Sequence, residues 1–347
     1  MVRGSMGHVG IIANPASGKD IRRLVAYGTV VDNQEKVNIV RRLILSLAAT
    51  GVTKITYMPE YYGIVPGAVE SICSRHRPDM EFAAADMCMT GTQLDSFRAA
   101  EIMAQCGVGC LITLGGDGTN RMVAKGCRDV PLLPISTGTN NVFPTLVEGT
   151  IAGLAAAVVA KGLVTGAPAI KPSKKLNIYK NGRLIDSAIV DAVVLNEAFI
   201  GSRAVWDAKK IRRIVVTRGE PHNIGIASIA GNLVPVMPGE PRGADIEVGP
   251  GSIQLRAPIA PGLIEQVPVR NYGYIRIGQV IEVNEACVIA LDGEREVEIR
   301  AGEKAHIELT FDGPKVIDAE AALRIAVAGG YSKFNNNFKP VHDEEEQ

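Results

Sequence analysis

The residues of this chain best suited to chemistry form one glycine-rich segment with a single carboxylate. It reads Leu114-Gly115-Gly116-Asp117-Gly118-Thr119. An apolar run at 110–113 predicts a buried strand before it, and a helix-forming segment at 120–127 follows. Backbone N–H groups and the positive end of the helix dipole would bind a phosphate there, and Asp117 could activate a hydroxyl or hold a metal. Asp-Gly is also an ordinary turn dipeptide, so the local pattern alone fits a simple turn equally well.

Two further segments also run from a predicted strand into small polar residues. The first contains Asn14, Ser17, Gly18 and Lys19, and the second contains Gly138, Thr139, Asn140 and Asn141. Lys19 could reach a phosphate as a point charge, although a solvated loop lysine fits the pattern as well. Loops at the carboxyl ends of neighbouring parallel strands converge on one crevice. We therefore expect the three segments to meet and to bind a triphosphate beside Asp117.

The elements that must position these loops alternate along the first 145 residues. Strands are expected at 8–13, 54–58, 110–114 and 132–135, and amphipathic helices at 35–49 and 93–104. This alternation predicts an α/β domain with a parallel, Rossmann-like sheet covered on both faces. The GxGxxG fingerprint is absent because Arg121 stands where its third glycine would be, which disfavours a dehydrogenase.

The second half of the chain has a different pattern of apolar and turn-forming residues. An alanine-rich helix is expected at 151–160, and from 175 to 311 short apolar runs are separated by turn dipeptides, which predicts a β-rich, sandwich-like domain. A helix at 317–327 is expected to return to the first domain. The predicted division is an α/β nucleotide-binding domain at 1–165 plus 314–335, a substrate domain at 166–313, and a disordered tail at 336–347.

The motifs NPASGK, GGDGT and GTNN, in this order and at this spacing, resemble those of the superfamily of NAD kinases and diacylglycerol or sphingosine-type lipid kinases. Within it, the chain is most similar to the ATP-NAD kinase branch that includes the acetoin catabolism protein X group. The resemblance covers the N-terminal half and thins in the C-terminal half. It implies an ATP- and Mg²⁺-dependent kinase in which Asp117 is the catalytic carboxylate. An Asp117 that merely caps the following amides would look identical in sequence.

Two pairs of residues in the second half bear on the acceptor. Asn196 and Glu197 match the Asn-Glu pair that NAD kinases place against the dinucleotide, so the resemblance implies that they bind substrate; a polar strand end is the alternative. Asp292 and Glu294 match the DGE element in which lipid kinases place a general base. An ordinary two-residue hairpin accounts for Asp292, whereas Glu294 stays open as the alternative base.

The amino-acid composition limits the classes of binding partner that we expect. Lys plus Arg and Asp plus Glu number 37 each, so no bulk charge favours nucleic acid, and a small-molecule substrate is expected. The chain has neither an apolar stretch of membrane-spanning length nor a signal-peptide pattern at its N-terminus, which favours a cytoplasmic protein. The six cysteines and five histidines lack the spacing of a zinc site. We expect a homo-oligomer, either a dimer or a tetramer.

Three functions follow from these patterns. The leading hypothesis is an NAD kinase-like enzyme that phosphorylates the adenosine 2′-hydroxyl of NAD to give NADP. The first alternative is a lipid or other alcohol kinase of the same fold. The second is a non-catalytic nucleotide-binding regulator linked to acetoin catabolism, suggested by segment 226–232, which lacks the threonines of the NAD kinase substrate loop. The cluster Lys209, Lys210, Arg212 and Arg213 could meet a substrate phosphate, but a solvated helix face is the favoured interpretation.

Overall fold

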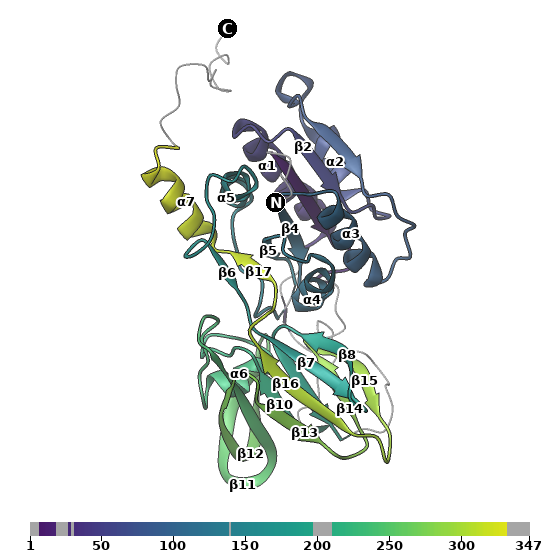
Figure 1. Cartoon of the computed structure of the whole chain (residues 1–347), viewed down its shortest axis with the longest axis vertical. Coiled ribbons are helices and arrows are strands. Elements are labelled where there is room, and N and C mark those ends of the chain that lie inside the picture. Colours follow the sequence, from purple (N-terminus) through teal and green to yellow (C-terminus); the bar gives the residue numbers. More distant parts are fainter. Residues whose placement is uncertain (1–6, 19–26, 29–30, 139, 197–209, 332–347) are drawn as a thin grey trace.

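The computed structural model describes residues 7–18, 27–28, 31–138, 140–196 and 210–331. The chain folds into two parts, an α/β part built mainly from the first half and a β-rich part built from the second (Figure 1). The predicted fold class is confirmed. Lys19, Thr139, Glu197, Lys209 and the predicted tail at 336–347 lie outside the described residues.

The first part contains a seven-stranded sheet with the strand order β3-β2-β1-β4-β5-β17-β6. Its strands are β1 (His8–Ala13), β2 (Lys54–Tyr57), β3 (Glu81–Ala84), β4 (Cys110–Gly115), β5 (Leu132–Ser136), β6 (Ile170–Pro172) and β17 (Lys315–Ile317). All neighbours pair in parallel except β6, which runs antiparallel to β17. Residues 170–172, assigned to the second domain from the sequence, therefore complete the first sheet as a short edge strand.

Helices cover both faces of this sheet, as the alternation predicts. They are α1 (Asn33–Ala49), α2 (Ile64–Ser71), α3 (Leu94–Gln105), α4 (Asp117–Gly126), α5 (Gly149–Ala160) and α7 (Ala319–Ala328), with a short 3₁₀ turn at Ser74–His76. Helices α1, α2, α5 and α7 share one apolar core with one face of the sheet. Helices α3 and α4 share another core with its opposite face.

Helix α4 begins three residues earlier than the sequence predicts. Gly116 is its N-cap residue with extended backbone, and Asp117, Gly118 and Thr119 form its first turn. The helix start could not be predicted from the glycines of this segment, because glycine has a low helix propensity. Most of the GGDGT segment is therefore the N-terminus of a helix, where backbone N–H groups lack partners within the helix.

The second part consists of two packed antiparallel sheets. The six-stranded sheet contains, in order, β12 (Leu263–Arg276), β11 (Arg242–Ala260), β10 (Ile211–Val216), β9 (Asp191–Leu195), β14 (Cys287–Leu291) and β15 (Glu294–Ile299). The four-stranded sheet contains β13 (Val280–Val283), β16 (Ala305–Thr310), β7 (Lys175–Lys180) and β8 (Arg183–Ala188). Apolar side chains from both sheets form one core between them. Helix α6 (Ala227–Gly231) packs with β10 and β11 in a separate core.

The chain returns to the first part at its C-terminal end. Strand β17 pairs with β5, and α7 then lies beside α5 (Figure 1). Asp318 caps α7 by accepting a hydrogen bond from the Ala321 amide at 3.0 Å. No helix among the described residues combines the length and apolarity needed to span a membrane.

Candidate functional site

The three predicted loops meet at the carboxyl ends of β1, β4 and β5, which are neighbours in the sheet. Asn14 Nδ2 donates to Thr119 Oγ1 at 2.8 Å, which joins the first loop to the GGDGT segment. The hydroxyls of Ser17 and Thr137 lie 2.9 Å apart and join the first loop to the third. The Thr137 amide donates to Gly115 O at 3.2 Å, which joins the third loop to the GGDGT segment. Each loop therefore contacts both of the others.

Glycines allow two of these loops to approach closely. A Cβ on Gly116 would lie 2.9 Å from Asn141 Oδ1, and a Cβ on Gly138 would lie 2.5 Å from the same atom. The Asn141 amide in turn donates to Ser136 Oγ at 2.6 Å, which fixes its side chain between the loops. A larger residue at Gly138 would push Asn141 away or separate the backbones. The close approach explains why both loops carry glycine there.

A buried lysine supports the first loop from beneath. Lys36 on α1 has no exposed surface, and its Nζ donates to Asn14 O at 2.9 Å, to Ser17 O at 2.8 Å and to Asn33 Oδ1 at 3.1 Å. These bonds hold the carbonyl groups of residues 14–17 toward the lysine. Sequence reasoning missed Lys36, although a lysine on the apolar stripe of α1, four residues before buried Val40, was an available signal.

The carboxylate of Asp117 is held by the third loop. Its Oδ1 accepts from the Phe143 amide at 2.8 Å, and both of its oxygens lie within 3.2 Å of the Val142 amide. Hydrogen bonds of this kind favour the ionised carboxylate. Buried Arg218 stacks over the Phe143 ring at 4.7 Å; burial lowers the pKa of Arg218 to about 10, while the charge of Asp117 acts in the opposite direction. Asp117 is thus fixed in place with a cation nearby.

The second part contributes Glu294 to the same place. Asp292 and Gly293, both with positive φ, form the two-residue turn between β14 and β15 that the sequence predicts. Glu294 follows this turn, and its Oε1 lies 3.3 Å from the position of a Cβ on Gly118. The carboxylate of Glu294 therefore faces the first turn of α4 from the opposite part of the molecule.

These groups line a cavity of about 640 Å³ between the two parts. From the three loops it includes Asn14, Ser17, Gly18, Gly116, Asp117, Gly118, Thr119, Gly138, Asn140 and Asn141, and from the second part Asp191, Ile224, Gly225, Ile226, Ala227, Asp292, Gly293 and Glu294. Asn140 is only 8% exposed, and neither atom of its side-chain amide has a hydrogen-bond partner among the described residues. A buried amide without a partner is a candidate position for contact with a bound molecule.

Two other loops complete the cavity and were not identified from the sequence. The loop after β2 contributes Glu60 and Tyr61, and the loop after β3 with the start of α3 contributes Thr92, Gln93 and Asp95. Both Glu60 oxygens accept backbone N–H groups of residues 62 and 64, and Asp95 accepts those of residues 90 and 91, so these carboxylates shape their own loops. No sequence motif marks these residues, because their place in the cavity depends on how the loops after β2 and β3 turn.

Asn196, which the resemblance placed at the site, does not line the cavity, and the predicted helix face at Arg212 and Arg213 is part of a strand. Asn196 is exposed and follows the end of β9, whereas Asp191 at the start of that strand lines the cavity. Five residues of extended strand separate the two by roughly 16 Å. Arg212 and Arg213 lie on strand β10 and not on the predicted helix face. Arg213 forms a two-bond ion pair with Asp245, and Arg212 pairs with Glu285, so both arginines are engaged within the second part.

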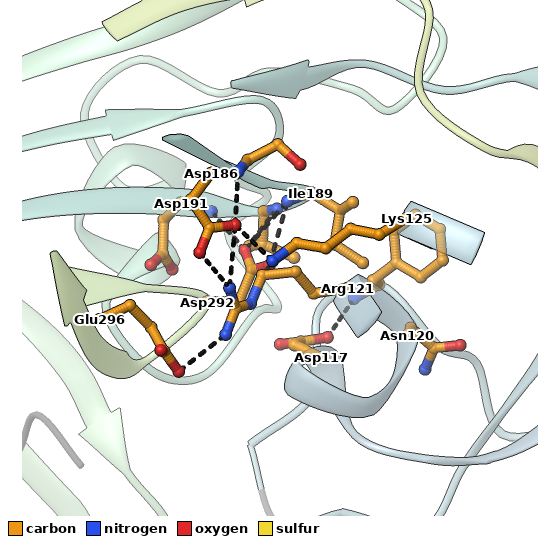
Figure 2. Close-up of polar contacts among 12 residues, drawn as sticks. Asp117, Asn120, Arg121, Lys125, Asp186, Ile189, Asp191, Asp292 and Glu296 are labelled. Carbon is orange, nitrogen blue, oxygen red and sulfur yellow. Dashed lines mark hydrogen bonds and ion pairs between the residues drawn. The ribbon is translucent and has the colours of Figure 1, made fainter. Parts of the chain in front are cut away.

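Figure 2 shows a cluster of charged side chains that includes Asp292, which also lines the cavity. Arg121 on α4 reaches the carboxylates of Asp186, Asp292 and Glu296 in the second part. Burial raises the pKa of Asp292. The positive charge of Arg121 and hydrogen bonds from three backbone N–H groups act to lower this pKa but do not outweigh burial. The sequence did not single out this cluster, since its members come from helix α4, strands β8 and β15, and the turn between β14 and β15.

The donor set of the cavity suits a cation that arrives with a nucleotide. The described residues contain no group of three or more Asp, Glu, His or Cys side chains that could hold a metal ion alone. The cavity lining nevertheless includes Asp117, Asp191 and Glu294, and no Lys or Arg is among its described members. Mg²⁺ commonly binds through one or two carboxylates together with substrate phosphates. The residues present fit that arrangement.

Comparison with known proteins agrees with this architecture. Residues 9–163 match the ATP-NAD kinase N-terminal domain, and residues 174–312 match the acetoin catabolism protein X C-terminal domain. Yeast NADH kinase, solved in complex with NADH, superimposes with a TM-score of 0.55 at 12% identity over 97% of this chain and 91% of that chain. An NAD kinase from Archaeoglobus fulgidus, solved with ATP, gives 0.44 at 15% identity over 94% and 100%.

The chain has the fold of the NAD kinases, with one α/β part and one β-rich part around a shared cavity. Acetoin catabolism protein X of Cupriavidus necator (strain ATCC 17699 / DSM 428 / KCTC 22496 / NCIMB 10442 / H16 / Stanier 337) is 40% identical over 329 residues, and the match covers 92% of each chain. The protein belongs to the acetoin catabolism protein X family.

Proposed function

We propose that this protein is an ATP-dependent kinase that transfers a phosphoryl group to the hydroxyl of a small molecule, with NAD as the leading acceptor. The observation that carries the proposal is the meeting of three glycine-bearing loops around Asp117 in one cavity. The match of residues 9–163 to the ATP-NAD kinase N-terminal domain supports the same conclusion.

The three loops are proposed to bind the triphosphate of ATP. The first turn of α4 presents backbone N–H groups, and Ser17, Thr119, Asn140 and Asn141 add hydroxyl and amide groups. Bound Mg²⁺ would spread the charge of the phosphates, with Asp191 and Glu294 as the carboxylates of the second part that could hold it. Lys19 and Thr139 remain proposed members of this binding site.

Asp117 is proposed to accept a hydrogen bond from the acceptor hydroxyl and to orient it. Phosphoryl transfer passes through a loose transition state, so positioning of the hydroxyl contributes more than strong basicity. Hydrogen bonds from the amides of Val142 and Phe143 fix the carboxylate in place, as this role requires. Asn196 and Glu197 remain proposed substrate residues by resemblance, although Asn196 would need a rearrangement to reach the cavity.

Replacement of Asp117 by Asn tests this role. We expect turnover to fall by about a hundredfold or more, because the carboxamide loses the charge and directs an N–H toward the Val142 and Phe143 amides. Asp129→Asn is the matched control, since that carboxylate is exposed and pairs with Lys315 at the surface. Turnover of Asp117→Asn close to that of the wild type would reject the assignment.

Glu294 supports a second candidate, a kinase for a different alcohol, including a lipid. Its carboxylate faces Gly118 across the cavity and could act as general base in place of Asp117. In that case Glu294→Gln would abolish transfer, and Asp117→Asn would reduce it less. A panel of NAD, NADH, diacylglycerol and short diols, assayed with both variants, separates the two assignments.

Formation of NADP from NAD by purified protein with ATP and Mg²⁺ tests the leading function. We expect NADP in amounts that grow with time and that depend on both ATP and the divalent cation. If ATP binds but no acceptor in the panel is phosphorylated, the non-catalytic nucleotide-binding regulator becomes the correct description, and the kinase proposal is rejected.

A further inference from the structure

Arg121 links the two parts of the molecule through a buried ion-pair cluster. Its side chain is 1% exposed, yet it begins on α4 and ends among carboxylates of the second part (Figure 2). Nη1 lies 3.2 Å from Asp186 Oδ2, Nη2 lies 2.9 Å from Glu296 Oε1, and Nε lies 3.9 Å from Asp292 Oδ2. Burial disfavours the charge, but these carboxylates together raise the pKa of Arg121.

Asp292 transmits this contact to the backbone of the second part. Its Oδ1 accepts from the Val190 amide at 2.8 Å and from the Asp191 amide at 3.1 Å, and Oδ2 accepts from the Ile189 amide at 3.0 Å. The residue is buried and adopts a positive φ of 50°. Asp-Gly is a favoured pair in a two-residue turn of this kind, and the three backbone hydrogen bonds to Asp292 hold the turn before Glu294 in place.

The contacts of Arg121 lie on both sides of Glu294 in the sequence. Asp292 precedes Glu294 by two residues and Glu296 follows it by two, so both anchors belong to the same hairpin. On α4, Gly118 and Arg121 are three residues apart and lie on neighbouring turns of one helix face. The same helix thus provides the small residue that Glu294 approaches and the guanidinium that fixes its hairpin.

We propose that Arg121 is a positioning residue that holds Glu294 at the first turn of α4, and so fixes the distance between the nucleotide-binding loops and the acceptor side of the cavity. This inference rests on the proposed kinase function for its catalytic meaning. Its structural content, the anchoring of the 292–296 hairpin to α4, is independent of that function.

The planar guanidinium is what this arrangement requires. It reaches three carboxylates in three directions, which the single ammonium group of lysine cannot reproduce. Arg121→Lys keeps the positive charge that the buried carboxylates need and loses the geometry. Lys125→Met is the matched control, because Lys125 lies one turn further along α4 and pairs with Asp186 without contacting Asp292 or Glu296.

Amide hydrogen exchange is the first measurement, made on the full-length protein without ligand. In Arg121→Lys we expect the Ile189, Val190 and Asp191 amides and the 292–296 hairpin to exchange about tenfold faster or more, because their anchor on α4 is loosened. Lys125→Met should leave them unchanged. Glu296→Gln, which removes one carboxylate and keeps Arg121, should give an intermediate effect and provides a second test if Arg121→Lys folds poorly.

Turnover kinetics are the second measurement. Arg121→Lys should lower kcat about tenfold or more while KM for ATP stays within about twofold, and the loss should largely vanish in a Glu294→Gln background. Equal losses in both backgrounds, or unchanged exchange at 189–191 and 292–296, would overturn the proposal. If the wild type transfers no phosphate to any acceptor, the kinase function fails, while hydrogen exchange still decides whether Arg121 positions the hairpin.

Discussion

At the scale of single residues, the site depends on buried polar groups that act on backbone. Lys36 fixes the carbonyl groups of the first loop, and the Val142 and Phe143 amides fix Asp117. Each of these contacts joins a motif residue to a residue outside the motifs, because Lys36, Val142 and Phe143 belong to none of NPASGK, GGDGT and GTNN. The motif residues line the cavity, and residues outside the motifs hold them in place.

Lys36→Met tests this support at one residue. The change leaves Asn14 O, Ser17 O and Asn33 Oδ1 without their buried donor, so we expect the first loop to move and ATP affinity to fall by about tenfold, or 1.4 kcal/mol. Calorimetric titration with ATP and Mg²⁺ measures the effect. Lys161→Met is the control, because that lysine also donates to a backbone carbonyl, Thr50 O, but lies remote from the loops. Equal affinities in all three proteins would show that Lys36 contributes only to stability.

The candidate site could be predicted from the sequence only in part. The convergence of the three loops followed from a general property of parallel sheets, so Asn14, Asp117 and Asn141 could be placed together. Asn196 was predicted to bind substrate because residues 196 and 197 match the Asn-Glu pair of NAD kinases. Such a match does not tell which end of β9 faces the cavity. Arg121 could not be identified because its partners meet it only after the two parts pack.

At the scale of elements, the strands were easier to predict than the helix starts. The bounds of β1 agree with the prediction because all six of its residues are buried and the apolar run is continuous. Helix α2 and strand β3 are short, and their sequences show no clear hydrophobic periodicity. The crossing of α1 and α5 shows how tightly the supporting layer packs, since a Cβ on Gly153 would lie 1.9 Å from Ser46 Oγ.

Gly153→Ala is predicted to separate α1 from α5. The added methyl group would overlap Ser46 Oγ and lie 3.0 Å from Leu43 O, so we expect a loss of roughly 1–3 kcal/mol in the free energy of unfolding, measured by urea denaturation. Ser46→Ala removes the nearest atom and should recover part of that loss in the double variant. A Gly153→Ala protein as stable as the wild type would contradict this packing.

At the scale of the whole molecule, the two parts are joined by more than the linking chain. Arg121 crosses between them within the site, and β6 with β17 brings both linking segments into the first sheet. Lys174 lies just after β6, where the chain leaves that sheet, and it has no exposed surface. Its Nζ donates to Met237 O at 2.9 Å and to Arg242 O at 2.6 Å.

Lys174 predicts a pH dependence of stability. Burial, with a smaller contribution from Arg218, lowers the pKa of Lys174 to about 7, against 10.5 for an ordinary lysine. Between these values the unfolded chain binds the proton and the folded chain does not. The free energy of unfolding should therefore rise with pH relative to that of Lys174→Met, by at most about 1.4 kcal/mol per pH unit. Urea denaturation at pH 7 to 10 measures it, and parallel curves for the two proteins would refute it.

The central claim is that three separate loops bind one triphosphate, and titration of the purified protein with ATP and Mg²⁺ tests it most directly. We predict saturable binding by the wild type and an affinity at least about tenfold lower for Gly138→Ala, whose methyl group would lie 2.5 Å from Asn141 Oδ1. Gly239→Ala has open space around the added methyl group and should bind like the wild type. Absence of ATP binding by the wild type, or undiminished binding by Gly138→Ala, would contradict the claim.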